Sequence, residues 1–513
     1  MRPASCPSSI RPQPLLLALV AAMVFTPVCA AGTVTVLNSN GNGPGSLRQA
    51  LLDAAPGDTI NFDASLSGAT IGPDPLTLEP LRITKDLTID GSALPSKVSL
   101  SGDLDGDGMG DAGVISVQAG VVASLKNLII TRGNTAGAGP GIANSGNLTI
   151  VDCEVTHNVS SSKGRGGGIA TFGPLSISRS TIANNTSGLG GGGIAVNIAA
   201  FTMTDSNVTG NGTPGNGGGI WISLANTGGV TITGSTIAGN TASFDGAGIY
   251  NEAQPVNLIG STVTGNTGGG NGGGLFGGFA INSSVVSNNT AGLSGGGIYV
   301  EGNKSLTVTG STLAGNQAAA GGYGGAILNR STATSTLINS TLSGNSAGYG
   351  GGIYNQSNGV VRLASVTLAN NQSPNPGGIG GLANVGVVHF VNTLIAGSTN
   401  GDCAALGPGT FPTRSGNLVQ EGTCFSASAF PSVMLGPLAD NGGPTQTHAL
   451  LPGSPAIDYG DNSYCDDNPG ANNLDQRGVT RPIDGDGIPG AVCDTGAFEL
   501  VVQTGPIFAN GFE

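Results

Sequence analysis

A short glycine-rich phrase recurs along the middle of the chain and constrains the fold more than any other feature. Each copy consists of small residues, mostly Gly, followed by Ile or Leu, as in Gly217-Gly218-Gly219-Ile220 and Gly295-Gly296-Gly297-Ile298. The copies fall between residues 139 and 383 at intervals of about 26 residues. Self-similarity at a period of this size indicates stacked units that each contact only their neighbours.

A second phrase and a third apolar piece keep the same period. The third piece, for example Val230-Thr231-Ile232, alternates apolar and polar residues, which is typical of a strand with one buried face. Each unit is therefore predicted to hold three short strands. The second phrase, Gly-Ser-Thr-Ile-Ala-Gly-Asn in one of its copies, ends at Asn158, Asn185, Asn211, Asn240, Asn266, Asn289, Asn316, Asn345 and Asn371.

Stacked three-strand units predict an all-β, right-handed parallel β-helix with about 26 residues per coil. Parallel pairing places equivalent residues in columns, so the aliphatic residues should fill the interior and the Asn residues should form an amide ladder. A flexible linker would not keep Ile and Asn in register, and a calcium-binding nonapeptide roll requires an Asp column that this chain lacks. The predicted ladder comprises Asn211, Asn240, Asn266, Asn289, Asn316, Asn345 and Asn371.

These phrases resemble the repeats of right-handed β-helix proteins of the pectate-lyase-like and polymorphic outer membrane protein types. The resemblance covers about residues 33–400 and implies the fold. Composition agrees with a repeat protein, because 92 of 513 residues are Gly and only 9% are charged. The net charge of −13 argues against nucleic acid as a partner. We expect a monomer.

Residues 1–30 read as a signal peptide. Arg2 and Arg11 precede an apolar run at residues 15–25, and Cys29-Ala30 ends the segment with small residues. This run is too short for a membrane helix, and no other segment is apolar enough, so we expect a chain that does not span a membrane. A lipoprotein anchor on Cys29 is the alternative. Secretion to the extracellular space or the bacterial outer surface is predicted.

The rest of the chain divides into four predicted parts: an N-terminal cap with the first coils (31–120), the β-helix repeats (121–400), a C-terminal module (401–500) and a tail (501–513). A capping helix is expected over residues 46–55, with Ser46 and Gln49 as a capping box. Residues 45–50 followed by residues 87–91 resemble the N-terminal cap of large bacterial surface β-helix proteins.

The C-terminal module carries four short motifs. Residues 436–450, 452–458, 475–478 and 493–499 resemble the choice-of-anchor Q module of secreted bacterial proteins, with Thr495 where that family usually has Ile. The resemblance implies a surface-associated protein. Four cysteines lie in this part, and two local disulfides are predicted with three pairings open: Cys403, Cys424, Cys465 and Cys493. Cys153 fits a buried strand position instead.

An acidic loop is the best candidate for a cation site. Asp103, Asp105, Asp107 and Asp111 alternate with other residues, and Gly108 permits a sharp bend, as in calcium loops. The loop lacks the Glu expected at its twelfth position, and a solvated acidic turn is the alternative. Residues 484–487, Asp-Gly-Asp-Gly, form a weaker second candidate.

Two classes of function remain open. A polysaccharide lyase or glycoside hydrolase requires clustered acids, yet we expect the few acids between residues 130 and 400 to form no column. His389 and His448 are predicted to be structural. A non-catalytic surface protein, adhesin-like or structural, that binds glycan or protein through its polar face is therefore the predicted function. The acids concerned are Asp152, Glu154, Asp205, Asp245, Glu252 and Glu301.

Overall fold

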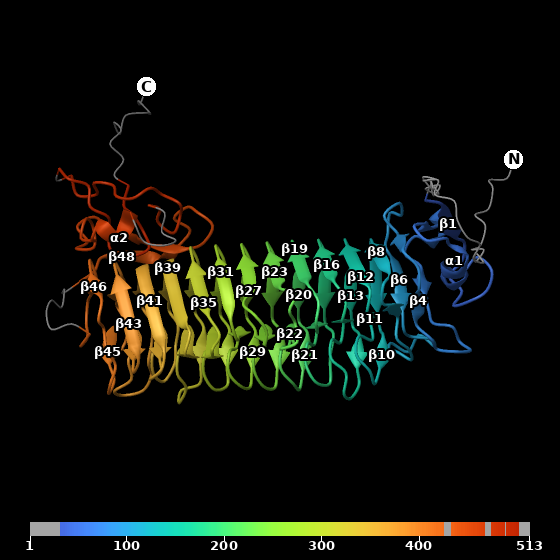
Figure 1. Cartoon of the computed structure of the whole chain (residues 1–513), viewed down its shortest axis with the longest axis horizontal. Coiled ribbons are helices and arrows are strands. Elements are labelled where there is room, and N and C mark those ends of the chain that lie inside the picture. Colours follow the sequence, from blue (N-terminus) through green and yellow to red (C-terminus); the bar gives the residue numbers. More distant parts are fainter. Residues whose placement is uncertain (1–30, 425–431, 467–472, 488, 502–513) are drawn as a thin grey trace, which may run out of the picture.

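The computed structural model describes residues 31–424, 432–466, 473–487 and 489–501. It shows one long, straight solenoid whose coils follow the chain in order from the N-terminal to the C-terminal end (Figure 1). Three parallel sheets of 27, 13 and 5 strands run along the solenoid, and we name them sheets A, B and C. The signal peptide and tail predicted at residues 1–30 and 501–513 lie outside the described residues, apart from Val501.

One central coil illustrates the repeat. The glycine phrase leads into β26 (Ile249–Asn251) of sheet B, and the chain then forms β27 (Val256–Ile259) and β28 (Thr262–Thr264) of sheet A. Gly260, with φ +55°, makes the bend between these two strands. Every strand pairs in parallel with its copy in the next coil, for example Ile249 with Leu275. The predicted right-handed parallel β-helix is confirmed, and the three predicted strands of the coil all form.

Sheet C is a further element that the repeat did not predict. Its strands hold two residues each, too few to show an alternating pattern, and follow the Asn of the second phrase. They are β21 (Gly212–Thr213), β25 (Thr241–Ala242), β29 (Thr267–Gly268), β33 (Thr290–Ala291) and β37 (Gln317–Ala318).

Sheet B extends along the solenoid from the first coils to the last. Its strands are β4 (Leu81–Ile83), β7 (Ile115–Val117), β11 (Ile142–Asn144), β15 (Ile169–Thr171), β18 (Ile194–Val196), β22 (Ile220–Ile222), β26, β30 (Leu275–Phe276), β34 (Ile298–Gly302), β38 (Ile327–Ser331), β40 (Ile353–Asn355), β42 (Leu382–Asn384) and β45 (Cys403–Ala405).

Sheet A contributes two strands to most coils, and these merge into single strands in β39 and β41. Its strands are β1 (Thr33–Val36), β2 (Thr59–Phe62), β3 (Thr70–Ile71), β5 (Leu87–Asp90), β6 (Val98–Ser101), β8 (Val122–Lys126), β9 (Leu128–Thr131), β12 (Asn147–Val151), β13 (Glu154–Thr156), β16 (Leu175–Ser178), β17 (Thr181–Ala183), β19 (Phe201–Thr204), β20 (Asn207–Thr209), β23 (Val230–Thr233), β24 (Thr236–Ala238), β27, β28, β31 (Phe279–Asn282), β32 (Val285–Ser287), β35 (Leu306–Thr309), β36 (Thr312–Ala314), β39 (Thr334–Ser343), β41 (Val360–Ala369), β43 (Val387–Val391), β44 (Leu394–Ala396), β46 (Arg414–Ser415) and β47 (Leu418–Val419). A separate pair consists of β10 (Asn134–Thr135) and β14 (Val159–Ser160).

The asparagine ladder forms as expected and extends further toward the N-terminus. Each Asn side chain from Asn158 to Asn345 donates from Nδ2 to Oδ1 of the next Asn, at 2.9–3.0 Å, and the ladder ends at Asn371. The backbone N–H of each residue donates to the same oxygen. These amides are fully buried, so the ladder satisfies polar groups that would otherwise be costly in the interior.

A second ladder, of serine hydroxyls, runs beside it. The backbone N–H of Ser235 donates to Oγ of Ser261, and that of Ser261 donates to Oγ of Ser284. The same contact recurs from Cys153 to Ser340. The Ser of the second phrase is therefore explained by the bend between the two strands of sheet A.

The glycine phrase occupies a crowded corner. Gly272 has φ +65°, in the left-handed region that favours glycine. A Cβ on Gly273 would lie 2.4 Å from the carbonyl carbon of Thr290 in the same coil. The corner therefore excludes side chains by close backbone contact as well as by dihedral angle.

The N-terminal end is covered by α1 (Leu47–Asp53). Ser46 accepts a hydrogen bond from the backbone of Gln49 at 3.2 Å, while the Gln49 side chain donates to Asp53 instead of returning to Ser46. Half of the predicted capping box therefore forms. Leu47, Ala50 and Leu51 are buried, so the helix shields the first coil.

At the opposite end the solenoid continues for one coil beyond the predicted end of the repeats at residue 400. β45 pairs with β42, and β46 and β47 extend sheet A. This coil lacks the glycine phrase but keeps buried apolar residues, and a disulfide joins Cys403 to Cys424 across it. The boundary at 400 was therefore wrong for the shaft, because the periodic phrases end before the strands do.

The remaining C-terminal residues fold back onto sheet A (Figure 1). This docked segment, residues 432–501, holds the antiparallel pair β48 (Leu435–Ala439) and β49 (Thr447–Leu450) and the short helix α2 (Ser463–Asp466), with a disulfide between Cys465 and Cys493. Gln476, from one of the C-terminal motifs, binds Thr312 and Thr341 of sheet A. None of the described helices has the length and apolarity needed to cross a bilayer.

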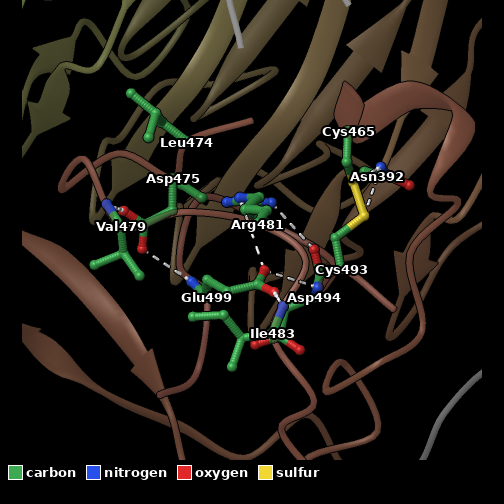
Figure 2. A network of polar contacts seen from close by, with 12 residues as sticks. Asn392, Cys465, Leu474, Asp475, Val479, Arg481, Ile483, Cys493, Asp494 and Glu499 are labelled. Carbon is green, nitrogen blue, oxygen red and sulfur yellow. Dashed lines mark hydrogen bonds and ion pairs between the residues drawn. A yellow bond between two sulfur atoms is a disulfide. The ribbon is translucent and has the colours of Figure 1, made fainter. Parts of the chain in front are cut away.

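Buried charges organise the docked segment (Figure 2). Arg481 donates to the backbone oxygens of Asp494 and Gly496 and lies 3.8 Å from the Glu499 carboxylate. Burial, together with the Glu499 charge, raises the pKa of Asp494 to about 7. Asp494 in turn accepts from the backbone of Asp458 and Leu500. The motif residues therefore hold loops together, which is a structural role.

Candidate functional site

Aromatic side chains form a column on the outer face of sheet B. The column occupies the position that directly follows the Ile or Leu of the glycine phrase, and strand register aligns its members in successive coils. We call Trp221, Tyr250, Phe276, Tyr299, Leu328 and Tyr354 the aromatic column. The sequence shows this signal, because five of six consecutive copies carry an aromatic residue there, but our prediction missed it.

The rings of the column stack on one another. The centroids of Tyr250 and Phe276 are 4.8 Å apart, and those of Phe276 and Tyr299 are 5.0 Å apart, with nearly parallel planes. At the N-terminal end, the Arg165 guanidinium lies 4.0 Å above the Trp221 ring. These rings are largely buried against each other, so this part of the column stabilises the shaft.

The C-terminal part of the column opens into a groove of about 700 Å³. One wall is formed by column residues and the other by turn residues around Tyr323, which is 40% exposed. The Tyr323 and Tyr354 rings meet at 4.7 Å with a tilt of 55°. The groove is lined by Asn271, Leu293, Ser294, Tyr299, Ala319, Gly321, Gly322, Tyr323, Leu328, Arg330, Tyr354 and Gln356.

A short polar relay orients the charged group in this groove. Arg330 donates from Nη1 to the Tyr299 hydroxyl at 2.8 Å, and that hydroxyl donates to Oε2 of Glu301 at 3.2 Å. Burial, followed by the nearby Glu301 charge, raises the pKa of Tyr299. Tyr299 therefore stays a neutral hydroxyl that fixes the guanidinium.

This combination of groups suits a ligand with both apolar faces and hydroxyl groups. Tyrosine rings offer apolar area with a polar end, while Arg330, Gln356 and Asn271 offer planar donors and acceptors. The volume lies within the range of small-molecule sites. Because lining residues come from successive coils, an extended ligand would lie along the solenoid axis.

Two carboxylates lie beside the same column. Glu252 and Glu301 each lie three residues after the Ile of their glycine phrase. Their two coils are separated by one coil, which carries Gly278 at the corresponding place in the sequence. Because this glycine interrupts the pattern, the two acids form no continuous column. Two coil steps correspond to roughly 10 Å. The Tyr250 hydroxyl donates to Glu252 at 3.2 Å, and neither Glu lines the groove.

The acidic loop brings together three of the four predicted carboxylates. Carboxylate oxygens of Asp103, Asp105 and Asp111 lie within 4.8 Å of one another, whereas Asp107 is outside this group and accepts from the backbone of Met109. The Asp103 side chain is only 2% exposed and lies 3.3 Å from Nη1 of Arg132. Three ligands could hold a cation, but Arg132 already balances part of their charge.

The second acidic candidate gains a partner from a distant motif. Asp484 and Asp486 lie within 4.8 Å of Asp458, all measured between carboxylate oxygens. Asp458 Oδ2 accepts from the backbone of Gly485 and Asp486. Burial raises the pKa of Asp458. Sequence reasoning could not place Asp458 here, since 26 residues separate it from Asp484.

The acids of sheet A near His157 are paired with bases. Asp152 accepts two hydrogen bonds from Arg179, at 2.8 and 2.9 Å, and these bonds hold its pKa below the ordinary value. Glu154 pairs with Lys97 at 2.8 Å. These pairs cross between coils, so they stabilise strand register on the outer face.

No family model and no curated protein matches the chain. A solved structure similar to this chain is the crystal structure of pectate lyase Pel9A, with 14% sequence identity and a TM-score of 0.33, over 93% of this chain and 98% of that one.

Proposed function

We propose that this chain is a secreted or surface-exposed, non-catalytic β-helix protein that binds an extended glycan in the groove beside the aromatic column. The observation that carries the proposal is the convergence of Tyr299, Tyr323 and Tyr354 with Arg330 and Gln356 in one groove. The tyrosine rings would pack against the apolar faces of sugar rings, and the planar polar groups would bind their hydroxyls.

Charge favours a neutral glycan as the ligand. The chain has a net charge of −13, and Glu252 and Glu301 lie beside the groove, so an anionic polymer would approach against repulsion. Arg330 offsets this repulsion only locally, because it is a single positive charge in a chain of net charge −13.

A glycoside hydrolase is the second candidate, and one observation favours it. Glu252 and Glu301 each lie three residues after the Ile of their glycine phrase, two coils apart, and a pair of carboxylates is what a glycoside hydrolase requires. Against this, each accepts a hydrogen bond from a tyrosine of its own coil, and the groove is lined by other residues.

A glycan array with the secreted full chain tests the proposal. We expect binding to neutral polysaccharides that falls at least tenfold, about 1.4 kcal/mol, in Tyr323→Ala and in Arg330→Gln. Phe244→Ala is the matched control, because Phe244 is an exposed aromatic side chain outside the groove. Equal binding by all four proteins would contradict the proposal.

A further inference from the structure

A second pocket lies where the docked segment meets the shaft. It has a volume of about 370 Å³, and Tyr464 of α2 covers one side. The floor belongs to the outer face of sheet A, at strands β39, β41 and β43. The pocket is therefore separate from the groove on sheet B and from both acidic clusters.

A polar column crosses the floor of this pocket. Register aligns Thr336 with Arg362 and Arg362 with His389. His389 Nδ1 is 2.9 Å from Oγ1 of Thr413 in the following coil. With Nδ1 accepting from that hydroxyl, Nε2 carries the proton and is a donor. Two hydroxyls, a guanidinium and an imidazole therefore lie in one line.

Among the side chains that the structure describes, which exclude residues 466–472, neither base of this column forms an ion pair with a carboxylate. Burial, together with the charge of Arg362, lowers the pKa of His389. Elsewhere along this sheet, each of Lys97, Lys126 and Arg179 pairs with a carboxylate from another coil. In a chain of net charge −13, adjacent bases without a carboxylate offer a local binding position for an anion.

The neighbouring column supplies an apolar wall. Ile338, Ala364 and Val391 are buried at equivalent positions of three coils, and Tyr464 packs against them. A ligand in the pocket would contact this wall on one side and the bases on the other. The pocket thus combines one anion-binding edge with one apolar face.

We propose that this pocket binds a small organic carboxylate with an apolar or aromatic body. Arg362 and His389 bind the carboxylate, since a guanidinium matches its two oxygens. The apolar body packs against Ile338, Val391 and Tyr464. The proposal does not depend on the glycan groove.

Calorimetric titration of the full chain with benzoate tests this assignment. We expect saturable binding that weakens at least tenfold when benzyl alcohol or inorganic phosphate replaces benzoate, because each lacks one half of the recognised chemistry. Arg362→Gln should weaken benzoate binding at least tenfold. Arg330→Gln, which alters the other site, should leave it unchanged.

Two further measurements keep the test decisive. Arg362 is exposed on its strand, so the thermal midpoint of Arg362→Gln should match the parent chain, which excludes misfolding. Tyr464→Ala should weaken benzoate binding more than acetate binding, since only benzoate uses the apolar wall. Binding of benzoate that is unchanged in Arg362→Gln, or matched by phosphate, would overturn the proposal.

Discussion

Truncation of one amide in the asparagine ladder should destabilise the protein severely. Asn266 donates from Nδ2 to the Asn289 side chain and to the Ile237 and Thr264 carbonyls, and its Oδ1 accepts from the backbone and side chain of Asn240. Asn266→Ala removes these contacts within a fully buried column. No solvent reaches the groups that lose their partner.

The expected magnitude follows from the groups left unsatisfied. The Asn240 backbone N–H and one hydrogen of the Asn240 side-chain amide lose their acceptor in the interior, whereas the Asn289 side-chain oxygen keeps the Asn266 backbone N–H. Each buried polar group without a partner costs about 1–3 kcal/mol. Adding the small cavity, we expect a loss of about 4 kcal/mol in the free energy of unfolding. That is a large share of the 5–15 kcal/mol typical of whole domains.

Urea denaturation monitored by circular dichroism measures this loss, with two controls. Asn257→Ala removes an exposed amide whose hydrogen bond to Thr231 is 3.5 Å long, so it should change stability by about 0.5 kcal/mol or less. Asn371→Ala, at the end of the ladder, should have an intermediate effect, since it bonds to one neighbouring Asn only. If Asn266→Ala were no more destabilising than Asn257→Ala, the side-chain hydrogen bonds of the ladder would not stabilise the stacked coils.

Three further predictions concern the ends of the shaft. If calcium binds the acidic loop, chelator should lower the thermal midpoint of the parent chain but not of Asp105→Asn; an unchanged midpoint in the parent chain would argue against a bound cation. The raised pKa of Asp494, about 7, means that the native state holds this proton more firmly than the unfolded chain. The associated stability is complete below about pH 4 and is lost as the pH rises through 7. The melting temperature of the docked segment should therefore fall over that range, and fall less in Asp494→Asn. A pH-independent difference between the melting temperatures of the two proteins would refute this. Replacing Cys403 and Cys424 by Ser should lower the free energy of unfolding of the last coil by about 2–5 kcal/mol, measured by urea denaturation. A smaller loss would show that strand pairing alone stabilises that coil.

The regular part of the fold follows from the sequence because every coil repeats the same contacts. The Asn at the end of the second phrase and the Ile after the glycines occupy identical surroundings nine or ten times, so their alignment in columns is almost forced by parallel pairing. The same logic would have revealed the aromatic column, which follows directly after that Ile.

Features built from the variable turns could not be predicted in the same way. The groove depends on Tyr323, which lies in a turn whose length differs between coils, and on its contact with Tyr354. The docked segment depends on contacts such as that of Gln476 with Thr312, 164 residues apart. Nothing periodic in the sequence specifies such pairs, because each occurs once and is set by the three-dimensional path of the chain.

Incubation of the full chain with the polysaccharide that it binds best distinguishes a glycan-binding protein from a glycan-cleaving enzyme. Binding is measured by calorimetry, and newly formed reducing or unsaturated ends are measured in the same samples over time. We expect saturable binding with no increase in either kind of end, and loss of binding in Tyr323→Ala. Release of new ends that stops in Glu301→Gln would contradict it and identify the protein as a glycan-cleaving enzyme.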